Sequence, residues 1–200
     1  MAEGGSSDHR SLVLATRNPD KVAEMRRLFE PSGITIELLD PDVVLPPEDG
    51  PTFADNALPK ALAAAAATGR ASIADDSGIE AAALDGAPGV RSARYAGPDA
   101  TDEENLSKLE AEAPPESRLR YVCALAYVDP ETGEERVFFG DCRGRMAHDP
   151  RGSGGFGYDP VFVPDATGEN RTMAELTDTE KDAISHRGHA VRALLKWIRR

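Results

Sequence analysis

Apolar residues recur along this chain at two spacings, which predict short strands and amphipathic helices. Residues 12–15 form an apolar run that ends in the turn signal Thr-Arg-Asn-Pro. Val22, Met25, Leu28 and Phe29 then follow at helical spacing, until Pro-Ser-Gly at residues 31–33 stops the pattern. Residues 34–38 read as a second strand. The chain therefore opens as strand, turn, helix and strand, which indicates an α/β protein.

A loop, a helix and a strand are expected next. Residues 40–51 contain four prolines and four acidic residues, which is typical of a loop. Thr52 and Asp55 resemble a capping box before an alanine-rich helix that reaches Thr68 and closes at Gly69. Pro59 within that stretch should kink the helix or mark its true start. Residues 71–74 are predicted to be a strand.

The second half of the chain predicts a charged helix, a long hairpin and a final helix. Residues 101–113 are charged and helical, whereas apolar residues alternate over 119–127 and a second strand follows at 136–146. The turn at 129–133 makes these strands an antiparallel hairpin. Val191, Leu194, Leu195 and Ile198 lie along one face of the last helix, and Ser185 is its expected N-cap. We expect one domain over residues 11–200 after a flexible tail at 1–10.

Composition and charge exclude several classes of protein. The apolar fraction of 40% is ordinary for a globular protein, and no apolar run reaches the ~20 residues that span a bilayer. A net charge of −12 argues against nucleic-acid binding, but it suits divalent cations. The polar residues 1–10 lack the apolar core of a secretory signal, so we expect a cytoplasmic protein with Cys123 and Cys142 reduced.

Residues 16–21 lie where a strand turns into a helix, and the positive end of a helix dipole favours an anion there. Thr16 and Asn18 can donate hydrogen bonds, and Lys21 adds a mobile charge, so a phosphate chain is a suitable ligand. The alternative is an ordinary capped helix with an exposed lysine.

Asp75 and Asp76 directly follow the strand predicted at 71–74 and should lie at its carboxyl end, where open α/β sheets bind ligands. Adjacent carboxylates repel unless a positive group lies beside them, and Mg²⁺ takes one or two carboxylates plus substrate phosphates. Only one of the two side chains needs to face the site, because successive strand residues point to opposite sides. The alternative is a solvated turn.

Two later stretches suit a flat base. Residues 151–159 contain four glycines, and among them Phe156 and Tyr158 offer aromatic faces while Asp159 can order the loop. The alternative is a flexible hairpin tip. His186 and Arg187 fall in the first turn of the last helix, where cations are poorly placed unless they serve another group, such as the carbonyl oxygens of a base.

Taken together and in order, six segments resemble one family: LATRNPDK, FADNALPKA, IADDSG, GAPGVRSARYAG, GGFGYDPVF and TDTEKDAISHRG. They are similar to the inosine/xanthosine triphosphate pyrophosphatases, the Ham1-type nucleotide house-cleaning enzymes. The resemblance implies an elongated mixed β-sheet with flanking helices, in two lobes around a central nucleotide-binding cleft. It also implies Mg²⁺-dependent hydrolysis of non-standard purine nucleoside triphosphates (ITP, dITP, XTP) to the monophosphate and pyrophosphate, by a homodimer.

The resemblance also implies a role for individual residues. The triphosphate would be bound by Thr16, Arg17, Asn18, Pro19, Asp20, Lys21 and Lys60. Asp76 would be the catalytic base and a metal ligand, with Glu48 as the second metal ligand and Asp49 as its alternative. Ser77 would contact substrate. The base and sugar would be held by Phe156, Gly157, Tyr158, Asp159, Lys181, His186 and Arg187.

Two positions depart from the family pattern. Arg17 stands where the family often has a small residue, so it either adds a phosphate contact or is simply exposed. Pro59 precedes Lys60 in a segment usually read as continuous helix, which leaves the direction of Lys60 open.

Two other functions are compatible with parts of the pattern. A Maf-like nucleotide pyrophosphatase would have an opening motif richer in Ser and Arg and would lack the Ser-His-Arg motif. A regulatory nucleotide-binding module without turnover would not need Asp75, Asp76 and Lys21 together.

Overall fold

The opening strand–helix–strand pattern folds as a parallel unit. In the computed structural model, which describes residues 11–200, β1 (Ser11–Leu14) and β2 (Thr35–Leu38) pair in parallel, joined by α1 (Pro19–Phe29) and the short turn η1 (Glu30–Ser32). Pro31 and Gly33 end the helix, as the pattern predicts. The tail expected at residues 1–10 lies outside the described residues.

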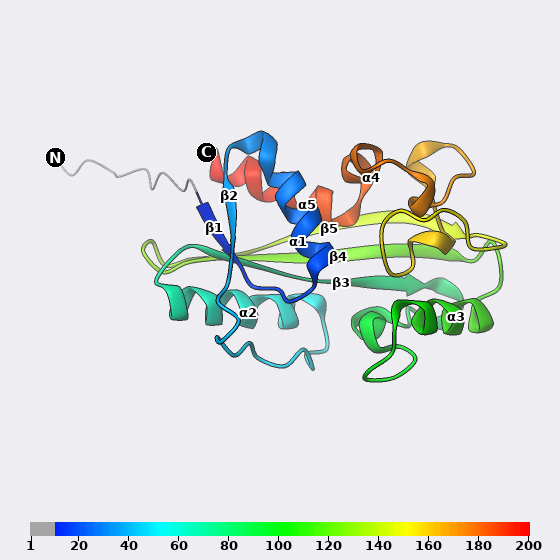
Figure 1. Ribbon diagram of the computed structural model, residues 1–200, viewed down its shortest axis with the longest axis horizontal. Helices are drawn as coiled ribbons and strands as arrows, with labels where there is room; N and C mark the ends of the chain where they lie inside the picture. The colour runs from blue at the N-terminus through cyan, green and yellow to red at the C-terminus, as the bar shows by residue number, and fades with distance from the viewer. Residues whose placement is uncertain (1–10) are drawn as a thin grey trace.

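A single six-stranded sheet runs through the described chain, in the order β2-β1-β3-β4-β5-β6. Its long strands are β3 (Ser72–Ala81), β4 (Arg118–Asp129) and β5 (Glu134–Met146), and the edge strand β6 is Phe162–Pro164. β1 pairs with β3 in parallel, whereas the pairs from β3 to β6 are antiparallel. The sheet is therefore mixed, and the three long strands side by side make it elongated (Figure 1).

Helices cover both faces of this sheet (Figure 1). α2 (Phe53–Thr68) and α3 (Asp102–Glu112) lie on one side, and α1, α4 (Asp178–Ile184) and α5 (His186–Ile198) lie on the other. The alanines of α2 pack on Ala74, Ala124 and Ala126 of the sheet, and these small side chains bring helix and sheet close together. The short turns are η2 (Ala82–Leu84), η3 (Gly89–Arg94), η4 (Asp159–Val161), η5 (Asp165–Thr167) and η6 (Met173–Glu175).

Most local predictions are confirmed. The hairpin pairs without interruption from Arg118 with Arg145 to Asp129 with Glu134. Thr101 caps α3 in a complete capping box, and Ser185 caps α5 by accepting a hydrogen bond from the Gly188 N–H. The predicted fold class, a mixed sheet with flanking helices, is confirmed. Among residues 11–200, no helix combines the length and the apolar composition that a membrane span requires.

Pro59 does not mark the start of α2. Thr52 Oγ1 accepts a hydrogen bond from the Asp55 N–H at 3.2 Å, so the helix begins at Phe53 and continues through Pro59. The proline side chain is exposed, and its neighbour Lys60 is buried on the sheet side. The capping signal therefore outweighs the proline in setting the start of this helix.

The strand predicted to end before Asp75 does not end there. β3 continues to Ala81, because β4 pairs with it along its whole length and supplies the hydrogen bonds that a turn would otherwise provide. Gly78 has a packing role: a Cβ at that position would lie 2.4 Å from Ser92 Oγ and 2.5 Å from the Gly89 carbonyl oxygen. The prediction that the two aspartates lie at the carboxyl end of their strand is wrong.

Candidate active site

The two aspartates instead lie in mid-strand, at the point where β3 loses one of its neighbours. β1 pairs with β3 only from Val13 with Ser72 to Leu14 with Ile73, and then turns away into α1. Residues 75–77 consequently have β4 on one side and an open notch on the other. Open α/β sheets bind ligands beyond the carboxyl ends of their strands. The notch lies beyond the carboxyl end of β1, so the strand that marks this site is β1 rather than β3.

Asp75 points towards the α1 and α5 side and is fully buried. Its Oδ2 atom lies 3.1 Å from Lys21 Nζ and 3.0 Å from Arg187 Nη2. Burial alone would raise the pKa of this carboxyl, but the charges of Lys21 and Arg187 outweigh it and hold the pKa well below its usual range. Asp75 is therefore a permanent carboxylate that anchors two cations.

Asp76 points to the opposite side, towards α2, and lines a cleft. Its Oδ2 atom accepts a hydrogen bond from Asn56 Nδ2 at 2.8 Å, and its Oδ1 atom accepts one from the Ser77 N–H at 2.9 Å. Within residues 11–200 it forms no ion pair. Burial raises the pKa of this carboxyl, only partly offset by the Asn56 hydrogen bond. Two neighbouring aspartates thus have opposite pKa shifts.

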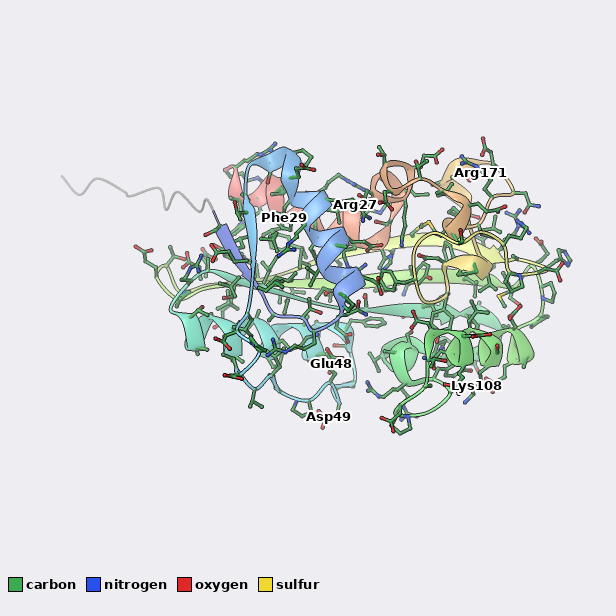
Figure 2. The ribbon with its side chains drawn as sticks, in the orientation of Figure 1. Arg27, Phe29, Glu48, Asp49, Lys108 and Arg171 are labelled. Carbon is green, nitrogen blue, oxygen red and sulfur yellow. The ribbon has the colours of Figure 1, made fainter. Side chains whose placement is uncertain are left out.

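Glu48 brings a second carboxylate to the cleft. It lies on the loop before α2, and its carboxylate contacts the ammonium group of Lys60. Lys60 Nζ also donates to the Asp75 carbonyl oxygen at 2.7 Å, so Lys60 links the acidic loop to β3 behind the cleft wall. Asp49 is exposed and lies on the outer side of the same loop, away from the cleft (Figure 2).

The start of α1 is closed by its own side chains. Asn18 Oδ1 accepts hydrogen bonds from the N–H groups of Asp20 and Lys21, at 2.9 and 3.1 Å, and Thr16 Oγ1 accepts one from the Asn18 N–H at 3.3 Å. These helix N–H groups are therefore already bonded. The cation that this turn contributes to the cleft is Lys21, held by Asp75.

Arg17 is directed away from the cleft. Its guanidinium donates to four carbonyl oxygens at 2.8 to 3.2 Å, those of Leu39, Asp40, Pro41 and Val43. Arg17 is exposed, as the second reading of this departure expects, and it does not line the cleft. Its hydrogen bonds fix the loop that leads to Glu48.

The glycine loop forms another part of the cleft wall. Asp159 Oδ2 accepts from the Phe156 N–H at 3.0 Å and lies 2.6 Å from Lys181 Nζ, so Asp159 orders the loop as predicted. Gly155 has φ +68°, and a Cβ there would lie 2.0 Å from Asp159 Oδ2, so both the turn and the close approach require glycine. Tyr158 is 6% exposed, and its hydroxyl donates to the Ser92 carbonyl oxygen at 2.7 Å. This hydrogen bond fixes the ring between the hydrophobic core and the cleft.

A buried charge network supports the ring of Phe156. Glu24 on α1 lies 2.6 Å from Lys181 Nζ and also contacts the Arg187 guanidinium. Lys181 Nζ and the Arg187 guanidinium carbon lie 4.9 and 5.8 Å from the centre of the Phe156 ring. These contacts hold two cations beside an aromatic ring that lines the same cleft as Asp76 and Glu48.

His186 is not the cation that its position in the sequence predicted. It is buried and stacks on Tyr121, with ring centres 4.7 Å apart and planes at 9°. Burial and the nearby Arg187 charge lower the pKa of His186 well below its usual value, so the ring is neutral near pH 7. Arg187 lies at the positive end of the α5 dipole, which disfavours a cation. Its ion pairs with Asp75 and Glu24 compensate for that unfavourable position.

One cleft brings together most of the predicted site residues. Its wall includes Asn18, Lys21, Glu48, Asp76, Ser77, Phe156, Gly157, Tyr158, Asp159, Lys181, His186 and Arg187. The remaining predicted residues do not line it: Thr16, Arg17, Pro19, Asp20 and Lys60. Pro19 and Asp20 are exposed in the first turn of α1.

Sequence reasoning missed three residues that the site depends on. Glu24 lies three positions after Lys21 on the same helix face, and that spacing was the available signal. Asn56 falls within the FADNALPKA segment, but the family resemblance implied no role for it. Tyr121, whose hydroxyl donates to Asp159 Oδ1 at 3.1 Å, reads in the sequence as an ordinary alternating strand residue.

The donor set at Asp76 and Glu48 fits a hard divalent cation that arrives with a phosphate ligand. Both side chains offer carboxylate oxygens to one cleft, and Asp76 has no cationic partner of its own in residues 11–200. The described residues contain no group of three or more His, Cys, Asp or Glu side chains arranged for a metal. Mg²⁺ is usually bound by one or two protein carboxylates together with phosphate oxygens of the substrate, and not by protein ligands alone. Asp76 and Glu48 match that pattern.

Comparisons with known proteins agree with this geometry. The Ham1 family matches residues 12–197. Proteins named dITP/XTP pyrophosphatase from Cutibacterium acnes and Frankia alni are 48% and 50% identical, over 94% of this chain and 95% and 96% of their own. The solved structure of a HAM1 protein from Coxiella burnetii has a TM-score of 0.81 at 40% identity, covering 94% of this chain and 98% of that one. Sequence, fold and cleft thus lead to one conclusion, that this chain belongs to the Ham1 family.

Proposed function

We propose that this protein hydrolyses non-standard purine nucleoside triphosphates (dITP, ITP and XTP) to the monophosphate and pyrophosphate, with Mg²⁺ as cofactor. The observation that carries the proposal is the combination of groups that line one cleft. Two carboxylates, those of Asp76 and Glu48, line it together with the Phe156 ring, which has the Lys181 ammonium group beside it. Relatives that are 48% and 50% identical are named dITP/XTP pyrophosphatases, which supports the proposed class of substrate.

Asp76 is the proposed general base. It lines the cleft, and burial raises its pKa towards the range in which a carboxylate accepts a proton more readily. Asn56 Nδ2 donates to Oδ2 of Asp76, and the Ser77 N–H of β3 donates to Oδ1, so these two hydrogen bonds set the orientation of the carboxylate. Asp76 would orient and deprotonate a water for attack on the α-phosphorus, and the pyrophosphate end would leave.

Asp76 and Glu48 are the proposed ligands of the metal. Bound Mg²⁺ supplies neutralisation of phosphate charge and Lewis-acid polarisation. Lys21 adds a protein cation at the cleft wall, and its ion pair with Asp75 holds it in place. Most of the rate enhancement would then come from positioning and electrostatics, as in other phosphoryl transfers.

Selectivity for the base is proposed to come from donors around Phe156. Lys181 and Arg187 present N–H groups there, and the neutral His186 has a buried Nδ1 atom without a hydrogen-bond partner in the described chain. A 6-oxo purine would accept hydrogen bonds that the 6-amino group of adenine would leave unmade, and unpaired buried groups penalise the wrong base.

We also propose that the protein is a homodimer. Phe139 on β5 is 61% exposed, although it lies in the middle of a long strand. Glu135 and Arg143 are exposed on the same face, each four residues from Phe139. A two-fold axis near Phe139 would place Glu135 of one protomer against Arg143 of its partner, as an isologous interface requires. The cytoplasmic location expected from the sequence stays a prediction.

The proposal is tested by incubating the protein with Mg²⁺ and, separately, ITP, dITP, XTP, ATP, GTP and UTP, with pyrophosphate and orthophosphate measured independently. We expect pyrophosphate from the first three nucleotides and little turnover of ATP. Orthophosphate as the primary product would contradict attack at the α-phosphorus. Preference for UTP would favour the Maf-like alternative, and binding without turnover would favour the regulatory module.

A further inference from the structure

Helix α4 carries Lys181 to the cleft, but little apolar contact holds the helix itself. It has only seven residues, and Lys181 is its one buried residue. Ile184 adds a partly buried contact with the core. A helix of this length is marginal on its own, so tertiary contacts must set its position.

The acidic residues of α4 flank Lys181 on both sides. At 3.6 residues per turn, Asp178 and Asp182 lie to one side of Lys181 around the helix, and Glu180 lies to the other. Each flank can therefore be held by a cation from a different part of the chain, with Lys181 between the two.

Arg27 of α1 holds the first flank. Its Nε and Nη2 atoms donate to the two carboxylate oxygens of Asp182 at 3.0 and 3.1 Å, and its Nη1 atom lies 3.4 Å from Asp178 Oδ2. Such two-pronged geometry is the form in which partly exposed ion pairs contribute measurably. It ties α4 to the helix that carries Lys21 and Glu24.

Arg171 holds the second flank. Its Nη2 and Nη1 atoms donate to the two carboxylate oxygens of Glu180 at 2.9 and 3.3 Å. Figure 2 shows Arg27 and Arg171 on opposite sides of α4. Arg192 of α5 closes the carboxyl end of α4, because its guanidinium donates to the carbonyl oxygens of Asp182 and Ala183 at 2.9 and 2.8 Å.

We propose that Arg27 and Arg171 are positioning residues, which hold α4 from both sides and so set the place of Lys181 against Glu24, Asp159 and Phe156. Neither arginine lines the cleft. Their effect on nucleotide affinity rests on the proposed function, because it requires that Lys181 contacts the nucleotide. Their effect on the position of Lys181 does not depend on that function.

The first test measures Lys181 directly, without substrate. The full chain is treated with an amine-acetylating reagent, and the rate of modification of each lysine is followed by peptide mass spectrometry. Lys181 is buried and should react slowly in the native protein, whereas the exposed Lys196 reacts fast. In the Arg27→Ala, Arg171→Ala double variant we expect Lys181 to react roughly fivefold faster or more, with Lys196 unchanged. An unchanged Lys181 rate would overturn the proposal.

The second test separates positioning from general destabilisation. With dITP as substrate, Arg27→Ala should raise KM about three- to tenfold while kcat stays within about twofold, since the proposed base is untouched. Combining Arg27→Asp with Asp182→Arg should restore part of the affinity. Arg26→Ala is the matched control, because Arg26 is the exposed neighbour of Arg27 and forms no ion pair within residues 11–200.

These outcomes can be told apart from failure of the proposed function. If the native protein does not hydrolyse dITP, the function is wrong, but the acetylation result still decides the role of the arginines. If turnover is normal and Arg26→Ala raises KM as much as Arg27→Ala does, or if the charge exchange restores nothing, the positioning role is wrong.

Discussion

The neighbouring carboxylates of Asp75 and Asp76 differ because a strand sends successive side chains to opposite faces. Asp75 meets Lys21 and Arg187 and stays charged, whereas Asp76 meets the amide of Asn56 and the cleft. A structural acid and a reactive acid are thus produced from adjacent identical residues. The chemistry is assigned by the partners of each carboxylate and not by the residue type.

Asp76→Asn should lower turnover of dITP by about 10²- to 10⁴-fold, the usual contribution of a positioned base, and leave the fold intact. The amide is nearly the same size, and Asp76 carries no ion pair in residues 11–200 whose loss would unfold the protein. Steady-state kinetics and thermal unfolding together check this. Asp49→Asn is the control, because Asp49 lies on the outer side of the same loop as Glu48, and it should keep the native turnover rate. If Asp76→Asn also keeps the native turnover rate, Asp76 is not the base.

Glu24 should make stability dependent on acidic pH. Burial opposes its charge, but Arg187 and Lys181 outweigh burial and lower the pKa of Glu24 from 4.5 to about 2. A carboxyl with a lowered folded-state pKa stabilises the protein fully above its unfolded-state value, and this stabilisation is lost as pH falls from about 4.5 towards 2. The amount is about 3 kcal/mol.

The matched variant is Glu24→Gln, which lacks this titration and leaves two buried cations short of a partner. Urea unfolding at pH 7 should show it less stable than the native protein by about 3 kcal/mol or more. The gap should narrow as pH falls to 3, because only the native protein loses the contribution of Glu24. Two stability curves that stay parallel between pH 7 and 3 would contradict this account.

At the scale of elements, the glycine loop and α4 meet at Asp159, which accepts from the loop and from Lys181. Gly155→Ala should therefore disturb substrate binding more than stability, because its Cβ would lie 2.0 Å from Asp159 Oδ2. We expect KM for dITP to rise about tenfold or more. Gly168→Ala is the control: its φ of +64° imposes similar backbone strain of about 1 kcal/mol, but nothing lies within 4 Å of its Cβ.

Thermal unfolding and kinetics of both glycine variants separate the effect of backbone strain at positive φ from the effect of the contact between the new Cβ and Asp159. Both variants should lose stability through backbone strain, Gly155→Ala more so because its Cβ also displaces the buried Asp159, and only Gly155→Ala should lose affinity. If Gly168→Ala raises KM equally, the effect is one of backbone strain in general, and the specific contact with Asp159 carries no weight.

At the scale of the whole molecule, the long β4–β5 hairpin exposes a face that α2 and α3 leave open at Phe139. Phe139→Asp should convert the proposed dimer into a monomer, because it buries a charge at the centre of the two-fold interface. Light scattering coupled to size exclusion measures the mass. Val44→Asp is the control, since Val44 is 88% exposed on a loop and outside the proposed interface. A native protein that is monomeric at micromolar concentration would refute the dimer.

The sequence alone determined the features that depend on near neighbours in the chain. The helices over 19–29, 53–68, 102–112 and 186–198, their caps at Thr52, Thr101 and Ser185, and the hairpin were all predictable. Amphipathic spacing and capping bonds act over three or four residues, so they are legible without the fold. The six segments in order were also sufficient to indicate the family.

Only the tertiary structure decided where β3 ends, which buried side chains stay ionised and which side chains line the cleft. β3 passes through its Asp-Asp-Ser-Gly motif because β4, more than 40 residues later, pairs with it. His186 is neutral, Arg17 faces a loop, and Glu24 joins the site because each meets partners distant in sequence. Hydrogen bonds and pKa shifts depend on atoms within a few ångströms, and only the folded chain brings those atoms together.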